Sequence, residues 1–420
     1  MRYLFSMAWH SAWNRRFTLG LTLLSIALSV TLLLGVERIR HDARQAFAQS
    51  VSGTDLVIGA RTSPVQLMLY SVFHIGEATN NIHWQAYQEI AANPTVAWSI
   101  PISLGDSHRG FPVLGTHAGY FEHFHYGNRQ SLTFETGKPF DGVFDTVIGS
   151  EVAASLGYHP GDHIVLTHGA GGLTGQDHND KPFVVTGILA PTGTPVDRTV
   201  HVSLEAIEAI HLDWQGGARM PGFEIPAEYV RKFDLTPKSV TAILIGLKSR
   251  AGVFRMQRLV NDYADEPLLA VLPGVALDQL WQVVGAAEHA FLAVSAMVVV
   301  VGLCGLVAVI LASLNERRRE LAIIRSVGAR PADIFVLLTA EGVFITLSGI
   351  LLGIALLYGI SAAMAPLIQG HFGIAITPRP VSLDELWLIA AIIGVSLLAS
   401  LVPGYGAYRM SLADGLTPRI

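Results

Sequence analysis

The sequence predicts an α-helical membrane protein with four transmembrane helices and a large mixed α/β extracytoplasmic domain inserted between helices 1 and 2. The mean hydropathy is +0.44. Hydrophobic residues make up 51% of the 420 residues and charged residues only 15%, against about 25% in soluble domains. The apolar residues gather in four long blocks, and a long segment of mixed composition separates the first block from the second.

A helix needs about 20 mostly apolar residues to cross the hydrocarbon core of a membrane. The segments that meet this requirement are residues 17–36, 290–314, 334–364 and 386–408. The first carries no charge and is longer than the 7–15 apolar residues of a cleavable signal peptide. No small-residue cleavage site follows it, so we expect a retained anchor.

The orientation follows from basic residues near the spans, because cytoplasmic loops carry an excess of Lys and Arg. Such residues precede the first span, fill the loop 315–333 and follow the fourth span: Arg2, Arg15, Arg16, Arg317, Arg318, Arg319, Arg325, Arg330, Arg409 and Arg419. The loop 365–385 carries only Arg379. We therefore expect residues 1–16, 315–333 and 409–420 in the cytoplasm, with residues 37–289 and 365–385 outside.

The outer segment, residues 37–289, reads as a mixed α/β domain. Short β-branched runs bounded by turn residues predict strands, for example at 183–189 and 242–247, and helical stretches alternate with them. Helices at 37–50 and 276–288 continue the first and second spans and would form a stalk. The single cysteine, Cys304, lies in the second span, so no intrachain disulfide supports this domain.

Two stretches of the outer domain admit a second interpretation. Residues 63–73 are strongly apolar but shorter than a span, which is typical of a buried core element; a surface facing lipid or an acyl substrate is the alternative. Residues 168–175 are rich in glycine but lack the Gly-Lys-Ser/Thr ending of a phosphate loop. We expect a flexible hairpin tip there.

Histidine is abundant in the outer domain, where it occurs as His117, His123, His125, His159, His163, His168 and His178. If the chain is extended there, His123 and His125 place both rings on one face. Imidazole is the commonest ligand of transition metals, so a Zn2+ or Cu site at these two residues is one hypothesis. No His-Glu-x-x-His helix accompanies them, and scattered surface histidines are the other interpretation.

The loop between the second and third spans has the pattern of a short helix. Leu321, Ile324 and Val327 repeat at helical spacing, and arginines flank this apolar stripe. Gly328 would end the helix, and Pro331 suits the first turn of the next. Such a helix can insert its stripe into a groove of a partner while its arginines pair with acids. The alternative is that the arginines only anchor the topology.

Two further features concern packing and energy supply. Gly349 and Gly353 in the third span have the GxxxG spacing that lets helices approach closely, although incidental glycines are equally common in spans. No Gly-x4-Gly-Lys-Ser/Thr motif occurs in the sequence. ATP hydrolysis, if it is used, must therefore be supplied by another chain.

The sequence resembles the MacB/FtsX-like permease family, also called type VII ABC transporters. The loop Asn-Glu-Arg-Arg-Arg-Glu-Leu-Ala-Ile-Ile-Arg-Ser-Val-Gly-Ala at 315–329 resembles the cytoplasmic motif of that family. Residues 7–16 are similar to its amphipathic entry helix. Residues 147–157, 160–162 and 185–193 look like its periplasmic core domain, and residues 408–415 look like its closing segment.

This resemblance implies a non-catalytic permease subunit in the bacterial inner membrane. It implies a cytoplasmic ABC ATPase partner that holds ATP and Mg2+, and a second permease chain in a homodimer or heterodimer. ATP-driven closure would be relayed to the MacB-like outer domain, a process called mechanotransmission. The residues expected to contact the ATPase are Glu316, Arg317, Arg318, Arg319, Glu320, Leu321, Ile324, Arg325, Val327 and Gly328.

Two other functions remain open at this stage. One is an FtsX-like regulator that moves a periplasmic partner, such as a wall hydrolase, without passing a substrate. The other is a metal-linked transport component that uses the outer histidines for Zn2+ or Cu. No cofactor is otherwise expected on this chain. The spans would contact membrane lipid, and a net charge of −5 gives no indication of a nucleic-acid partner.

Overall fold

The structure, a computed structural model, describes residues 16–169, 177–215, 218–220, 225–316, 326, 328–372 and 379–408. It divides into two compact units. One unit contains four long helices, and the other contains the outer domain, residues 43–284. Each unit is described separately below.

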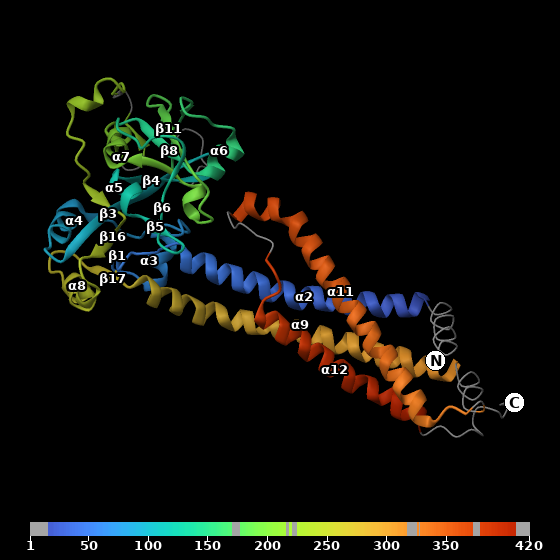
Figure 1. The fold of residues 1–420 in the computed structure, drawn as a ribbon. Helices are drawn as coiled ribbons and strands as arrows, with labels where there is room; N and C mark the ends of the chain where they lie inside the picture. Colours follow the sequence, from blue (N-terminus) through green and yellow to red (C-terminus); the bar gives the residue numbers. More distant parts are fainter. Residues whose placement is uncertain are drawn as a thin grey trace. The chain divides into compact units, whose positions relative to one another are not determined.

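The outer domain alternates strands with short helices, as the sequence predicts (Figure 1). Its helices are α3 (Pro64–Ser71), α4 (Trp84–Ala91), α5 (Gly119–His123), α6 (Ser150–Leu156), α7 (Leu204–His211) and α8 (Val253–Asn261), with 3-10 turns η1 (Pro195–Arg198), η2 (Val230–Lys232) and η3 (Arg250–Gly252). Its strands are β1 (Leu56–Ala60), β2 (Ile82–His83), β3 (Val96–His108), β4 (Phe111–Thr116), β5 (His125–Tyr126), β6 (Gln130–Ser131), β7 (Phe134–Gly137), β8 (Asp145–Ile148), β9 (His163–Ile164), β10 (Thr167–His168), β11 (Phe183–Leu189), β12 (Val200–Ser203), β13 (Trp214–Gln215), β14 (Ala218–Arg219), β15 (Ser239–Val240), β16 (Ala242–Leu247) and β17 (Leu268–Val271).

One large sheet organises the domain. Its strand order is β17-β1-β16-β3-β4-β12-β8-β11-β7, with β10 paired to β3 and β9 paired to β11. The β17-β1-β16-β3-β4 part is antiparallel, whereas β4 with β12 and β8 with β11 are parallel pairs. The long strand β3 pairs with β16 on one side and with β4 on the other. It thus links the antiparallel strands β17, β1 and β16 to the part of the sheet that contains the parallel pairs.

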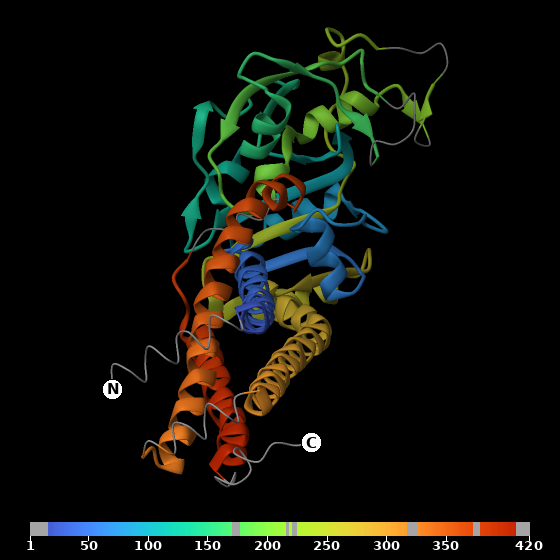
Figure 2. The same cartoon turned by 90° about the vertical axis from the view of Figure 1, so that its right-hand side faces the viewer.

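Both faces of the sheet are buried. Because successive side chains of a strand point to opposite faces, Leu56 and Ile58 enter one apolar core while Val57 enters another. Helices α4 and α8 cover one half of the sheet, and α6 and α7 cover the other half (Figures 1 and 2). Helix α3 packs against β1, where Leu67 and Met68 are almost fully buried. The apolar stretch 63–73 is thus a core element rather than a lipid-facing surface.

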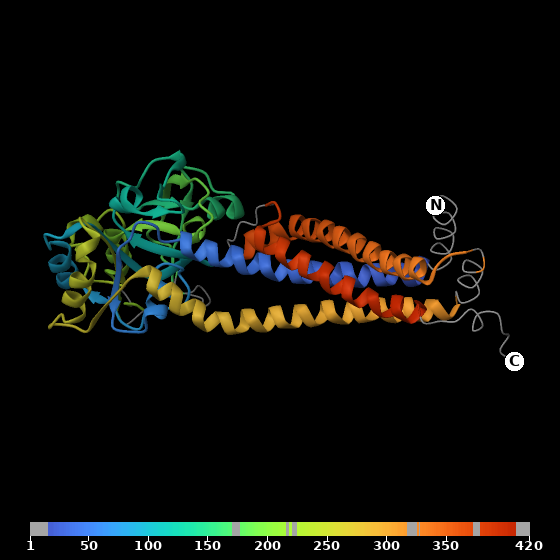
Figure 3. The ribbon, with the colours of Figure 1, turned by 60° about the horizontal axis from the view of Figure 1, so that its bottom comes forward.

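The other unit contains most of four helices: α2 (Arg16–Gln49, of which residues 16–42 belong to it), α9 (Pro273–Glu316, of which residues 285–316 belong to it), α11 (Pro331–Phe372, of which residues 331–366 belong to it) and α12 (Leu383–Tyr408) (Figure 3). Four described segments are long and apolar enough to cross a membrane: Arg16–Asp42, Val284–Ala312, Pro331–Ala365 and Leu383–Val402. Four such helices, with an α/β domain between the first and the second, confirm the predicted fold class. Both α2 and α9 continue beyond their apolar segments as unbroken helices, up to Gln49 and back to Pro273.

Two glycines of α11 lie against α2. A Cβ on Gly349 would be 2.8 Å from Cγ2 of Ile26, and one on Gly353 would be 2.7 Å from the carbonyl oxygen of Ala27. The hydroxyl of Thr31 donates a hydrogen bond to the carbonyl of Gly353 at 2.9 Å. A side chain at position 353 would therefore meet the backbone of α2, and one at position 349 would meet the side chain of Ile26.

A buried ion pair joins two of the membrane helices near the end of the apolar segment of α2, Arg16–Asp42. Arg38 Nε lies 2.9 Å from Oε1 of Glu385, whose side chain is fully buried at the start of α12. The Arg38 guanidinium also lies over the ring of Tyr358 on α11. Arg379, just before α12, contacts both Asp42 at 3.1 Å and Glu385 at 3.6 Å. At this point α2 and α12 are therefore held together by ion pairs between charged side chains, and not by apolar packing alone.

Candidate functional site

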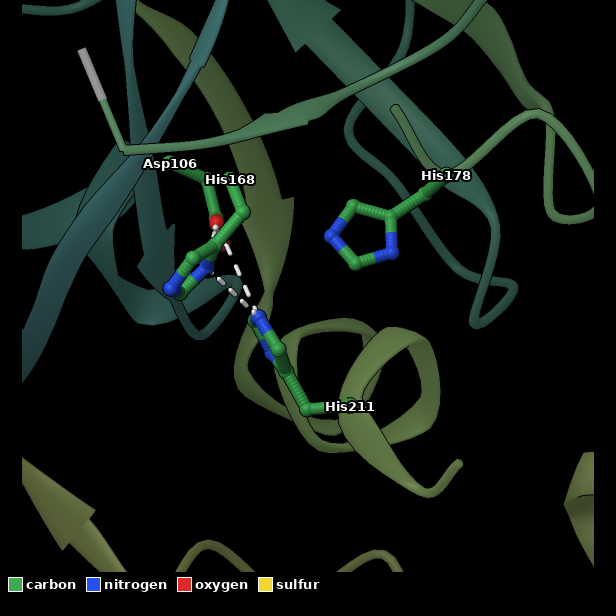
Figure 4. A group of neighbouring side chains, drawn as sticks. All are labelled: Asp106, His168, His178 and His211. Carbon is green, nitrogen blue, oxygen red and sulfur yellow. Dashed lines mark hydrogen bonds and ion pairs between the residues drawn. The ribbon is translucent and has the colours of Figure 1, made fainter. Parts of the chain in front are cut away.

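Four potential metal ligands converge in the outer domain: Asp106, His168, His178 and His211 (Figure 4). Asp106 and His168 face each other as cross-strand partners in the antiparallel pairing of β3 with β10. A register shift between β3 and β4 falls at this point, and Gly105 has a φ of +148°. Such a bulge redirects the side chains that follow it. The irregularity in β3 thus contributes to the orientation of Asp106.

The other two ligands come from different elements. His211 is the last residue of α7, which packs on β4 and β12. His178 follows the bridge between Thr167 and Asp177, and its backbone N–H donates to the carbonyl of Leu166 at 2.9 Å. The bridge between Thr167 and Asp177 therefore places His178 close to His168 on β10.

Three ligand atoms of this group form a small triangle. His168 Nδ1 is 3.0 Å from Asp106 Oδ1 and 3.1 Å from His211 Nε2. His211 Nε2 is 3.7 Å from Asp106 Oδ1. All four residues offer a ligand atom within 4.8 Å of the others.

The hydrogen bonds fix which ring nitrogens carry protons. His211 Nδ1 donates to the carbonyl of Ile207 at 2.8 Å, so the neutral ring presents an unprotonated Nε2 to the triangle. His168 Nδ1 then holds the one proton that Asp106 and His211 share as acceptors. The hydrogen bond to Asp106 raises the pKa of His168 above its ordinary value.

His178 is the unusual member of the group. Its side chain is fully buried, and neither ring nitrogen has a hydrogen-bond partner among the residues that the structure describes. Leaving a buried polar group unpaired costs about 1–3 kcal/mol. Burial lowers the pKa of His178 to about 4, so the ring is neutral at pH 7 and one of its two nitrogens carries a lone pair that can bind an ion. In Figure 4 a ring nitrogen of His178 faces the other three side chains.

The group is accessible from solvent. Asp106, His168 and His211 line an open pocket of about 300 Å³, whose wall also includes Glu208 and Lys238. His178 lies behind them, against the ring of Trp214 at a centroid distance of 4.5 Å. A small ion can therefore reach the group through the pocket.

The histidines singled out from the sequence, His123 and His125, do not belong to this group. His123 is the last residue of α5 and stacks on Trp98, and His125 begins β5. The extended stretch that would place both rings on one face is therefore absent. His125 Nδ1 instead hydrogen-bonds to the carbonyl of His123 at 2.7 Å. Neither joins a group of three or more potential ligands in the described part of the chain.

The expected ATPase-contacting loop is only partly described. Glu316 is the last residue of α9, and residues 317–325 and 327 lie outside the described residues. Gly328 has a φ of +109°, a conformation that favours glycine. Pro331 is the first residue of α11, and the N–H of Arg330 donates to the Asp333 carboxylate at 2.8 Å. The turn between Gly328 and Pro331 thus has the geometry of a helix boundary.

The fold and the four apolar helices define an integral membrane protein with a large domain between its first two spans. The chain matches the family described as MacB-like periplasmic core domain over residues 19–251 and the family described as FtsX-like permease C-terminal over residues 292–412. Together these matches cover most of the sequence and both units. The chain therefore belongs to the MacB/FtsX-like family of ABC transporter permeases, and its inserted domain is extracytoplasmic.

Individual relatives are distant. The pyoverdine export ATP-binding/permease protein PvdT of Pseudomonas entomophila is 25% identical over 400 residues, which are 88% of this chain and 55% of that protein. The lipoprotein-releasing system transmembrane protein LolC of Xylella fastidiosa is 22% identical over 294 residues, 66% of this chain and 65% of that protein. The chain thus spans between half and two thirds of the length of these relatives. The periplasmic region of MacB from Actinobacillus actinomycetemcomitans aligns with 55% of this chain and 94% of its own, at a TM-score of 0.33 and 10% identity.

Proposed function

We propose that this chain is the membrane subunit of an ATP-driven transporter of the mechanotransmission type. An ABC ATPase would supply hydrolysis, as membership of this permease family implies; the 420 residues themselves contain no phosphate-binding loop. ATP-driven movement at the cytoplasmic face would pass along the spans to the outer domain. The names of the relatives mention different cargoes, pyoverdine and lipoproteins. The proposal for this chain therefore includes the mode of action of the family but no cargo.

The observation that carries this proposal is the continuity of α2 and α9. Each runs without a break from an apolar span into the sequence that flanks the outer domain. A continuous helix transmits a displacement at one end to the other, because its backbone hydrogen bonds keep it stiff. These two helices are therefore suited to carry motion between the coupling loop and the outer domain.

We assign the contact with the ATPase to the loop that follows α9, residues 316–321, 324, 325, 327 and 328. In the proposed orientation this loop and both termini are cytoplasmic. The left-handed conformation of Gly328 supports a helix that stops there. A second permease chain and lipid would cover the remaining apolar surface, since only 22% to 39% of each span is buried within the described bundle.

Charge reversal in the loop tests this assignment. Arg325→Glu removes a positive charge beside the apolar stripe, and Gly328→Val forces a β-branched residue into a left-handed conformation. Losing a charge pair at such an interface costs about 2–5 kcal/mol. We expect both variants to insert normally but to recover much less ATPase activity when the tagged chain is purified from its native membrane.

The matched control is Arg330→Glu, which makes the same charge change at an exposed position outside the assigned contact. It should recover ATPase activity like the unmodified chain. If all three variants behave alike and keep full ATPase activity, the loop is only a topological anchor and the proposed coupling is wrong.

A further inference from the structure

We propose that Asp106, His168, His178 and His211 form a binding site for one Zn2+ ion on the outer domain. The inference concerns the outer domain alone and does not depend on the proposed ATPase contact. Its basis is the distances within the group, the hydrogen bonds behind it and the burial of His178.

The distances fit a tetrahedral ion. Zinc binds imidazole nitrogen and carboxylate oxygen at about 2.0–2.2 Å, which places neighbouring ligand atoms of a tetrahedron roughly 3.4 Å apart. The three distances among Asp106 Oδ1, His168 Nδ1 and His211 Nε2 are 3.0, 3.1 and 3.7 Å. These atoms therefore already form a face close to that of a zinc tetrahedron.

His178 supplies the fourth corner. It is buried without a partner for either nitrogen among the described residues, and its ligand atom lies within 4.8 Å of the other three. If the four residues formed only a hydrogen-bonded network, the buried imidazole would make a hydrogen bond through at least one of its nitrogens. A bound metal would give this ring the partner that the described residues do not supply.

The surroundings of the ligands also suit a metal. The carbonyl of Ile207 holds His211 in the tautomer that directs Nε2 into the site, as such outer contacts do for metal-binding histidines. Zinc would bind Nδ1 of His168 in place of the proton that this atom shares with Asp106 and His211, and the neutral ring would then carry its proton on Nε2.

The choice of ion follows from the donor set. Three nitrogens and one oxygen do not suit Ca2+ or Mg2+, which prefer oxygen ligands. A tetrahedral arrangement favours Zn2+ over Cu2+ and Ni2+, which prefer square-planar or tetragonal sites. The open pocket in front of Asp106, His168 and His211 gives the ion a route from solvent.

The test uses the full chain, purified in detergent with an affinity tag that lacks histidine. We expect it to retain one zinc ion per chain after incubation with ZnCl2 and desalting, measured by elemental analysis. Co2+ in place of zinc should give the intense visible absorption of a tetrahedral site. Zinc should also raise the unfolding temperature, because it binds the folded state.

Two variants locate the ion. His178→Phe places an apolar ring in the buried position against Trp214, and His211→Gln changes a ligand that is partly exposed at the pocket. Each should lower the zinc affinity at least about 100-fold, since losing an outer contact alone costs 10–100-fold. The second variant keeps the test valid if the first does not fold, which circular dichroism would show.

The matched control is the double variant His123→Gln, His125→Gln, which removes two histidines of the same domain outside the group. It should bind zinc like the unmodified chain. The proposal is overturned if the unmodified chain binds no stoichiometric zinc, if both site variants retain full affinity, or if the control loses the ion.

Discussion

Arg38 and Glu385 illustrate how single residues connect the membrane helices. Arg38 is 7% exposed and Glu385 is fully buried, so both charges have left water. Glu385 accepts hydrogen bonds from Arg38 and from the backbone N–H of Ser382. A buried pair of this kind contributes little over an apolar pair, but removing one partner leaves a charge without compensation.

We therefore expect Glu385→Gln to destabilise the helix bundle by about 3–5 kcal/mol. The combined change Arg38→Met, Glu385→Met should cost much less, because both charges of the pair are removed and Arg379 keeps its contact with Asp42. Thermal unfolding of the detergent-purified chain measures both effects. Asp384→Asn is the matched control, since this neighbouring side chain is exposed and should have almost no effect. Equal losses for the single and the double variant would contradict this account of the pair.

At the scale of elements, the contact between α11 and α2 depends on glycine. Gly353→Ala would place a Cβ 2.7 Å from the carbonyl of Ala27, and backbone atoms cannot move away without separating the helices. We expect this variant to lose about 1–3 kcal/mol through overpacking. Its unfolding temperature should fall even though alanine favours a helix more than glycine does.

Gly359→Ala, in the same helix, is the control. A Cβ there would meet no described atom within 4 Å. The better helix propensity of alanine should then leave the stability unchanged or slightly higher. If Gly353→Ala and Gly359→Ala raise the unfolding temperature equally, the two helices do not pack closely at Gly353.

Some elements could be predicted from the sequence because their patterns are local. Strands β11 and β16 coincide with the β-branched runs at 183–189 and 242–247. The central strand β3 was not predicted, because Pro101 and Gly105 interrupt its apolar pattern and such residues usually argue against an inner strand. Only pairing with β16 and β4 reveals it as a strand.

The four residues of the proposed zinc site are harder to predict, because they are distant in sequence. Asp106 and His168 are 62 residues apart, and His168 and His211 are 43 residues apart. The sequence singles out His168 and His178 only as members of a histidine-rich domain, and it does not point to Asp106 or His211. The only local features at these two residues are the glycine that precedes Asp106 and the end of a helix at His211, and neither feature predicts a metal ligand. The pairing of β10 with β3 brings Asp106 and His168 together, and the end of α7 places His211 beside them; no sequence period encodes either contact.

At the scale of the whole molecule, the function depends on which side of the membrane each part of the chain lies. Family membership and four apolar helices establish a membrane permease with an extracytoplasmic domain. The proposed coupling needs the basic loop to face the ATPase on the opposite side from that domain. The charge distribution predicts this arrangement, because arginines concentrate in the loop 315–333.

Cysteine labelling tests this arrangement most directly. The native Cys304 is first changed to Ser, and single cysteines are then placed at Ser131 on β6 or at Ser326 in the basic loop, both exposed positions. In intact spheroplasts, a membrane-impermeant thiol reagent should label the cysteine at 131 and leave the one at 326 unlabelled until the membrane is opened. Equal labelling of the two positions in intact spheroplasts would contradict the account, because the loop and the outer domain would then lie on the same side.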